Sequence, residues 1–343
     1  MTPSPTPQSQ GHYFVPAVSN YSTFLSAGIF MLALGFIFKL NGVPAGTWSM
    51  LFGAALILYV IFGWFGEVIS ENVSGVYTLW EDRSYRIGMV WFIFSEVMFF
   101  ACFFGVLYYI RRIALPELGG YEQAYTPYAG FTGAWPSSGP LGETFTPMKA
   151  WGIPALNTML LLTSGATLTW AHWGLIKNKR SQLVWGLALT VILGAVFMGF
   201  QAYEYAHAYS ELGLTLGAGV YGATFFILTG FHGMHVTLGT IMLIVMWARS
   251  LKGHFSEHNH FAFEAVAWYW HFVDVVWLIV FVFIYWILST GDWRSRGLFQ
   301  TPLRDDAKVK SRQQHQEQAD RQGHPHSQRL DHPVFIALLA KQQ

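Results

Sequence analysis

Seven long apolar runs constrain the fold of this chain more than any other feature of its sequence. They are residues 21–40, 48–66, 87–110, 154–176, 183–203, 219–248 and 261–288. Each run is long enough to cross a hydrocarbon core of about 30 Å as a helix. Backbone hydrogen bonds cannot be left open in lipid, and runs this continuous fit helices better than barrel strands. The sequence therefore predicts an all-α integral membrane protein with seven transmembrane helices.

Composition supports the membrane class. Hydrophobic residues make up 53% of the chain and charged residues only 11%, whereas a soluble domain has about 25% charged residues. The formal net charge of +1 provides no basic face for nucleic acid, so no such partner is expected. The single cysteine, Cys102, excludes disulfides within the chain and any cysteine-based metal cluster.

The links between the runs predict two groups of helices. Residues 41–47 form a tight turn rich in Gly and Pro, whereas residues 67–86 form a longer polar link. We therefore expect a hairpin at 21–66 and a five-helix group at 87–289. The other predicted parts are a polar N-terminal tail at 1–20 without signal-peptide features, an ordered loop at 111–153 over the membrane surface, and a polar C-terminal tail at 290–343.

Basic residues give a small orientation signal. One predicted side of the membrane holds Arg83, Arg86, Lys177, Lys179, Arg180, Arg249 and Lys252. The other side holds Lys39, Arg111, Arg112, Lys149, Arg294 and Arg296. Under the positive-inside rule, this distribution predicts a cytoplasmic N-terminus and a C-terminus on the outer side.

The last apolar run carries three ionisable residues, Glu264, His271 and Asp274. An ionisable group in a lipid-spanning helix costs several kcal/mol unless it has a partner. Seven residues make about two helical turns, so Glu264 and His271 share a face, and Asp274 follows one turn later. This helix is therefore expected to present a polar stripe to other protein groups.

The preceding run adds His232 and His235, which are neighbours on one helix face. Together with His271 and Asp274 they suggest a transition-metal site, because imidazole and carboxylate ligands suit several such metals. The alternative is a set of hydrogen bonds between packed helices, which the sequence favours. Two opposed histidine pairs for a haem are not evident in the spacing.

Two acids in other runs have different expected environments. Glu96 has apolar residues for several turns on both sides, and Arg86 lies ten residues away, off its face. Because desolvation disfavours a charged carboxyl, Glu96 must be protonated or face a partner, water or a lipid headgroup. A proton-related role is expected for it. Glu204 lies near the end of its run, where contact with solvent is expected.

Several segments resemble one known family. The segments GVYGATFFILTGFHGMHVTLGTIMLI and HFAFEAVAWYWHFVDVVWLIVFVFIYW resemble subunit III of cytochrome c oxidase, as do GMVWFIFSEVMFFACFF, LPELGG and ALNTMLLLTSGATLTWAH. The resemblance extends from the first hairpin to about Leu288. Quinol oxidase versions typically lack the first two helices, so the hairpin favours the cytochrome c branch.

The resemblance implies a subunit with no catalytic residue, metal or redox cofactor of its own. Haem a and copper would lie in partner subunits I and II, and the whole complex would oxidise cytochrome c, reduce oxygen to water and pump protons. The implied fold places the first two helices against the other five around a V-shaped cleft that holds phospholipids. The implied role is to stabilise subunit I and to support proton uptake and oxygen entry.

The resemblance also implies residue roles. Family positions that contact lipid or line the cleft fall on Trp64, Glu71, Arg86, Arg249 and His260, and the acid of the third helix falls on Glu96. Because the family keeps no metal, an interhelical polar network is expected at His232, His235, Glu264, His271 and Asp274.

Three departures from the family pattern qualify this assignment. Phe65-Gly66-Glu67 replaces a common Trp-Arg-Asp, which puts one basic lipid contact in question, and TWAHW lacks a second His. Added residues before Trp135 and beyond Leu288 suggest a bacterial version, in an inner membrane with a periplasmic C-terminus. The residues alone leave two other functions open: a membrane metalloenzyme using His232, His235 and His271, and a proton-coupled carrier using Glu96.

Overall fold

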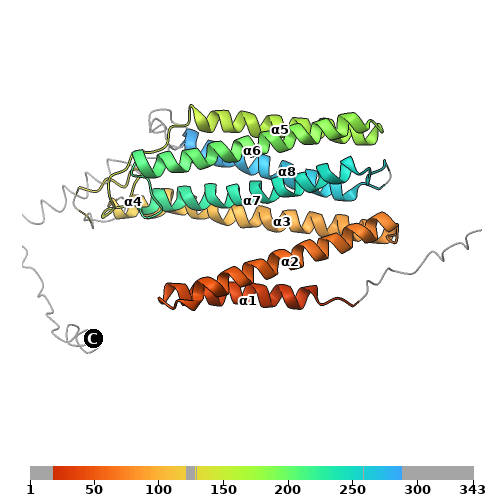
Figure 1. The fold of residues 1–343 in the computed structure, drawn as a ribbon. Helices are drawn as coiled ribbons and strands as arrows, with labels where there is room; N and C mark the ends of the chain where they lie inside the picture. The colour runs from red at the N-terminus through yellow and green to blue at the C-terminus, as the bar shows by residue number, and fades with distance from the viewer. Residues whose placement is uncertain (1–17, 121–127, 129, 258, 288–343) are drawn as a thin grey trace, which may run out of the picture. The chain divides into compact units, whose positions relative to one another are not determined.

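The computed structural model describes residues 18–120, 128, 130–257 and 259–287, which are mainly helical (Figure 1). The seven long helices are α1 (Tyr21–Leu40), α2 (Ala45–Ser74), α3 (Leu79–Tyr109), α5 (Ile153–Ile176), α6 (Arg180–Glu211), α7 (Gly219–Leu251) and α8 (Phe261–Val280). Helix α3 continues through a π-helical turn, Ile110–Ala114, into the short α4 (Leu115–Leu118), and α8 continues through another at Phe281–Trp286. The described residues contain no β-strand, so the all-α prediction is confirmed.

Six of the long helices in the described part of the chain are long and apolar enough to cross a membrane. They are α1, α2, α3 with its continuation, α6, α7 and α8, so the chain is a multi-pass membrane protein. The seventh predicted span exists as α5, but it is less apolar than the others. Its polar residues include Asn157, Thr158, Thr163, Ser164, Thr167, Thr169 and His172.

Helices α2 and α3 extend further than the sequence predicted. The expected polar link at 67–86 is mostly helical, because α2 runs to Ser74 and only residues 75–78 precede α3. Glutamates in this stretch are good helix formers and do not interrupt it. Gly75 ends α2 in the left-handed region with φ of 75°, and the Thr78 hydroxyl caps α3 by accepting from the backbone N–H two residues on, at 3.3 Å.

The described part of the 111–153 segment packs against the start of α7. Trp135 lies edge-on to Tyr221 with ring centroids 5.4 Å apart, and Phe145 stacks on the same ring at 5.0 Å. The Tyr221 backbone N–H donates to the Ser137 carbonyl at 3.1 Å. Residues 121–127 and 129, the predicted tail at 290–343 and most of the tail at 1–20 lie outside the described residues.

Glycines allow α1 and α2 to pack closely. A Cβ atom on Gly35 would lie 2.6 Å from the backbone nitrogen of Met50, and one on Gly53 would lie 2.7 Å from that of Leu32. Approach at this distance brings the two backbones into contact, which small residues permit in membrane helices. The described core cluster formed by the later helices contains no residue of this hairpin.

Helix α8 contributes the largest side chains to that core. Trp270 and Trp277 are seven residues apart, so they share a face of α8, and both are fully buried. Each indole N–H donates to a hydroxyl of α5, Trp270 to Ser164 at 2.9 Å and Trp277 to Thr158 at 3.0 Å. Two of the polar residues of α5 therefore act as hydrogen-bond acceptors for the buried indoles of α8.

The ring of Trp270 occupies a slot that two glycines create. A Cβ atom on Gly194 of α6 or on Gly239 of α7 would lie 2.8 Å from a carbon of this ring. A Cβ atom on Gly233, also on α7, would meet nothing within 4 Å. The missing side chain of Gly239 therefore makes room for the Trp270 ring against α7, whereas that of Gly233 does not.

This contrast predicts opposite effects for one substitution at two sites. Gly239→Ala should destabilise the chain relative to Gly233→Ala by about 1–3 kcal/mol, because the added methyl group displaces the Trp270 ring. Gly233→Ala should be neutral or stabilising, since alanine favours a helix over glycine by up to about 1 kcal/mol. Thermal unfolding of both variants in the same detergent measures the difference. Equal midpoints would show that the slot does not control packing.

Candidate functional site

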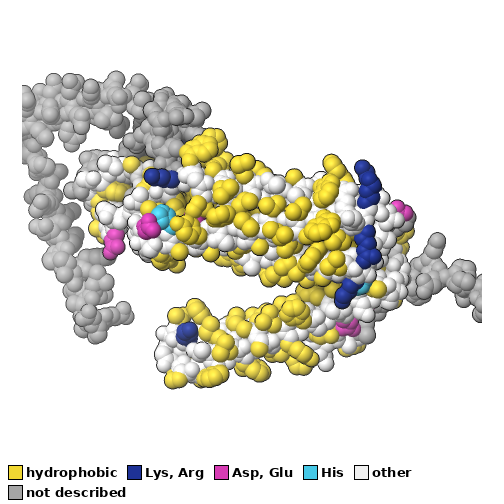
Figure 2. Space-filling view, turned by 45° about the horizontal axis from the view of Figure 1, so that its top comes forward, with side chains coloured by type: hydrophobic (Ala, Val, Ile, Leu, Met, Phe, Trp, Pro, Cys, Tyr) yellow, Lys and Arg dark blue, Asp and Glu magenta, His cyan; other side chains and the backbone are white. Residues whose placement is uncertain are grey.

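Three helix connections lie at one end of the described structure, those between α2 and α3, α5 and α6, and α7 and α8 (Figure 1). Lys and Arg side chains gather at this end (Figure 2). Its connections and adjoining helix ends carry the larger of the two predicted basic sets, which includes Arg86, Lys179 and Arg249. The polar residues described next lie around the same connections.

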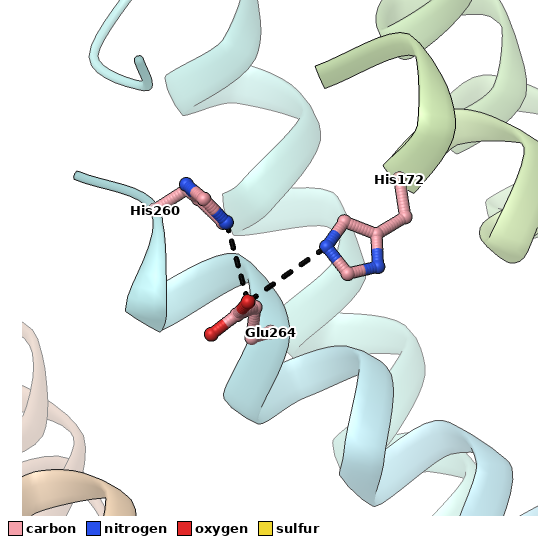
Figure 3. A group of neighbouring side chains, drawn as sticks. All are labelled: His172, His260 and Glu264. Atoms are coloured by element: carbon pink, nitrogen blue, oxygen red, sulfur yellow. Dashed lines mark ion pairs between the residues drawn. The ribbon is translucent and has the colours of Figure 1, made fainter. Parts of the chain in front are cut away.

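Glu264, in the first turn of α8, is the centre of a polar cluster. Its Oε2 atom forms an ion pair with Arg86 of α3, which also pairs with Asp82 at 2.8 Å. Its Oε1 atom lies 3.2 Å from Nε2 of His260 and 3.9 Å from Nε2 of His172 on α5. Figure 3 shows both rings directed at this carboxylate. The cluster therefore connects α3, α5 and α8.

The members of this cluster are largely withdrawn from solvent. The exposed fraction of the side chain is 12% for His260, 17% for Glu264 and 27% for His172. Arg86 is more open, at 35%, and its guanidinium also lies over the Phe261 ring at 5.0 Å. Partly buried charges are screened by salt less than surface charges, so the cluster is stronger than an exposed ion pair.

Glu96 lies beside a histidine of another helix. His235 Nε2 on α7 is 3.0 Å from Glu96 Oε2, and His235 Nδ1 is 2.6 Å from the Phe231 carbonyl. The His235 side chain is only 7% exposed and Glu96 is 21% exposed. A neutral imidazole that donates one N–H to the carbonyl has its second nitrogen as an acceptor, so this contact needs one shared proton. Glu96 therefore has the interhelical partner that the sequence left open.

The other polar residues of α7 and α8 make separate contacts. His232 Nε2 lies 3.2 Å from the Val273 carbonyl. His271 Nδ1 lies 3.6 Å from an Asp274 oxygen, and its Nε2 lies 3.4 Å from the Thr169 hydroxyl. Among the described residues, His232, His235 and His271 do not form a metal-binding group. The predicted network is thus divided into several local contacts.

The comparisons with known proteins bear on the whole helical region. The family model described as cytochrome c oxidase subunit III matches residues 11–289. The chain belongs to the cytochrome c oxidase subunit III family. It is 40% identical over 262 residues to a protein named cytochrome c oxidase subunit 3 from Marchantia polymorpha. The aligned region covers 76% of this chain and 91% of the relative.

Relatives from distant organisms have the same name. One from Arabidopsis thaliana is 39% identical over 281 residues, which covers 81% of this chain and 98% of the relative. One from Latimeria chalumnae is 43% identical over 238 residues, 69% of this chain and 83% of the relative. The resemblance inferred from the segments of the third, fourth, sixth and seventh spans is confirmed.

The five positions that the resemblance assigned to lipid have different surroundings. Arg86 and His260 belong to the Glu264 cluster. Arg249 is buried, donates to Asn72 at 3.1 Å and lies 4.7 Å from the centre of the Phe255 ring. Glu71 accepts from the Tyr77 hydroxyl at 2.6 Å, and burial raises the pKa of Tyr77. Trp64 is 40% exposed and stacks on Tyr21.

The environment predicted for Glu204 is wrong. This residue is 2% exposed and lies beside Tyr285, although it was expected to contact solvent. The sequence places it near the end of an apolar run, but α6 continues to Glu211, two turns further, and Tyr285, which follows α8, contacts it. A run of apolar residues marks the lipid-facing part of a helix, and it does not mark where the helix ends.

His172 is the member of the Glu264 cluster that sequence reasoning did not assign to a site. The four-residue spacing of His260 and Glu264 places them on one helix face and is a usable signal. His172 lies on α5, and nothing in the sequence pairs it with α8.

The contact between Glu96 and His235 predicts a non-additive effect on stability. His235→Leu leaves the Glu96 carboxyl without its partner and should destabilise the chain by about 1–3 kcal/mol. The double variant Glu96→Leu/His235→Leu should recover much of this loss, because both polar groups are gone. Thermal unfolding of the parent, both single variants and the double variant gives the coupling energy. Additive effects would mean that the two side chains do not interact.

Proposed function

We propose that this chain is the non-catalytic subunit III of a proton-pumping cytochrome c oxidase in a bacterial inner membrane. Subunits I and II of the complex hold haem a and copper, and the complex passes electrons from cytochrome c to oxygen, which becomes water. The match of the family model over residues 11–289 is the observation that carries this proposal. It spans the described helices, and it includes the hairpin that favours the cytochrome c branch over the quinol branch.

An apolar surface on α1, α2 and α3 supports a position within a larger assembly. Trp48, Phe62 and Trp91 have exposed fractions of 76%, 76% and 66%. Apolar side chains of this size need lipid tails or another chain against them. We infer that this surface meets phospholipid and subunit I, and that the chain stabilises subunit I through it.

We further propose that the hairpin and the five later helices form a V-shaped pair of bundles with phospholipid between them. Near the end of α2, Asn72 contacts Asn259 of the α7–α8 connection at 3.3 Å and Arg249 of α7 at 3.1 Å. The described core cluster begins at α3. Contacts concentrated at one end leave room for the helices to diverge toward the other, where lipid tails can fill the space.

Arg249 is the residue best placed to hold a lipid headgroup. Its side chain is buried, one amino group donates to Asn72, and its Nε atom has no hydrogen-bond partner within the described chain. A buried guanidinium donor is costly unless an acceptor reaches it. A lipid phosphate supplies such an acceptor in the geometry that guanidinium prefers.

The proposed orientation places the α2–α3, α5–α6 and α7–α8 connections on the cytoplasmic side. They carry the larger basic set, and anionic headgroups attract such residues. Glu96 and His235 lie deeper, in the span of α3 and α7, and we assign them a supporting role in proton uptake. A proton-coupled carrier that uses Glu96 is the alternative function.

Gentle purification separates these functions. The oxidase proposal predicts that larger chains co-purify with this one and bring the visible spectrum of haem a together with copper. A carrier would be isolated as a stable protein without these chains and without haem. The visible spectrum and a metal determination on the same preparation decide between the two outcomes.

Arg249→Ala should lower the amount of bound phospholipid per complex and leave the haem spectrum unchanged. The expected loss is one lipid per complex, because one headgroup contact is removed. Lys179→Ala is the matched control, since it removes an exposed cation at the same end of the molecule. Lipid extraction with phosphorus determination is the measurement. A phospholipid content that is equal in the parent and in Arg249→Ala would contradict the assignment.

A further inference from the structure

The side chains of His172, His260 and Glu264 point toward one another at the N-terminal end of α8 (Figure 3). One ligand atom from each residue lies within 4.8 Å of the other two. We propose that this group binds a divalent transition-metal ion of the Zn²⁺ type. Among the described residues, no other group of three His, Cys, Asp or Glu residues has its ligand atoms this close together.

The distances are close to those that a metal requires. Nitrogen and oxygen ligands about 2.0–2.2 Å from Zn²⁺ in tetrahedral geometry are separated by about 3.3–3.6 Å. His260 Nε2 and Glu264 Oε1 are 3.2 Å apart, and His172 Nε2 lies 3.9 Å from the same oxygen. The ligand atoms of all three residues lie within 4.8 Å of one another, so the two rings must move closer together to bind one ion.

The histidine nitrogens are prepared for a cation. His260 Nδ1 lies 3.0 Å from the Ser256 carbonyl, so its N–H donates there and its Nε2 carries the free lone pair. A metal-bound histidine commonly makes such a bond with its other nitrogen. His172 Nε2 is a buried atom without a hydrogen-bond partner in the described chain, and it faces the same position.

The charges around the group favour a cation. Asp82 and Glu264 are two carboxylates, and Arg86 supplies one guanidinium between them. With neutral imidazoles the cluster keeps one net negative charge. Arg86 holds Oε2 of Glu264, which orients Oε1 toward the two rings. A cation at Oε1 therefore meets a net negative charge, which favours its binding.

The donor set selects the class of metal. Two imidazoles and one carboxylate suit Zn²⁺ and related ions, whereas Mg²⁺ and Ca²⁺ prefer oxygen ligands. Three protein ligands leave a fourth position for water or another small ligand. The ion would connect α5 to α8 where the α5–α6 and α7–α8 connections lie. This proposal differs from the expectation of a chain without metal, and it does not depend on the oxidase assignment.

Zinc binding to the full chain in detergent tests the proposal. The protein is stripped with a chelator and incubated with Zn²⁺, and bound zinc is counted after gel filtration. Affinity is measured by competition with a chromophoric chelator. The parent should hold one zinc per chain. His172→Gln and His260→Gln should each weaken zinc binding by at least about 10–100-fold. Loss of a residue that only hydrogen-bonds to a metal ligand already has an effect of this size, and loss of a ligand itself should have a larger one.

The control is His207→Gln. His207 and Glu211 also form a pair at 3.2 Å with four-residue spacing, and their side chains are 35% and 68% exposed, but this pair has only two ligands and is not a three-ligand group. Zinc binding should be unchanged in this variant, and a thousandfold excess of Mg²⁺ should not displace zinc from the parent. Circular dichroism checks that each variant is folded, and if one histidine variant does not fold, the other decides. Zinc that is absent from the parent, or held equally by a folded His172 or His260 variant, would overturn the proposal.

Discussion

Polar groups inside apolar helices need partners from neighbouring helices, and the arrangement of this chain depends on that constraint. Helix α8 shows it most clearly. Its two buried indoles donate to hydroxyls of α5, and Glu264 pairs with Arg86 of α3. In hydrocarbon, apolar contacts alone distinguish poorly between helix and lipid. The polar contacts therefore specify which faces of α3, α5 and α8 meet, and glycines such as Gly239 allow the approach.

The same constraint accounts for polar groups at one end of the helices and in their middle. The end with the α2–α3, α5–α6 and α7–α8 connections carries paired charges, a buried arginine and the His172–His260–Glu264 group. The middle of the described helices contains an isolated pair, Glu96 with His235. We propose that these groups bind ligands and hold the helices in position, which agrees with a supporting subunit of an oxidase whose electron-transfer chemistry we assign to the partner chains.

Much of this arrangement follows from sequence, since apolar runs located the seven long helices and the spacing of Glu264 and His271 indicated a polar stripe. Partners were less accessible. Glu96 and His235 are 139 residues apart, and only the packing of α3 on α7 brings them together. Glu204 was misjudged because helix length is set by capping and packing as well as by hydropathy. The link at 67–86 was misjudged for the same reason, since glutamates extend a helix as readily as they leave one.

An experimental density map of the purified assembly at side-chain resolution tests the central claim most directly. The account predicts that the Glu264 carboxylate contacts Arg86 through one oxygen and faces His260 and His172 through the other. It also predicts that Glu96 contacts His235. Glu264 and Glu96 side chains that point into lipid, without a protein partner, would contradict the account that interhelical polar pairing organises this chain.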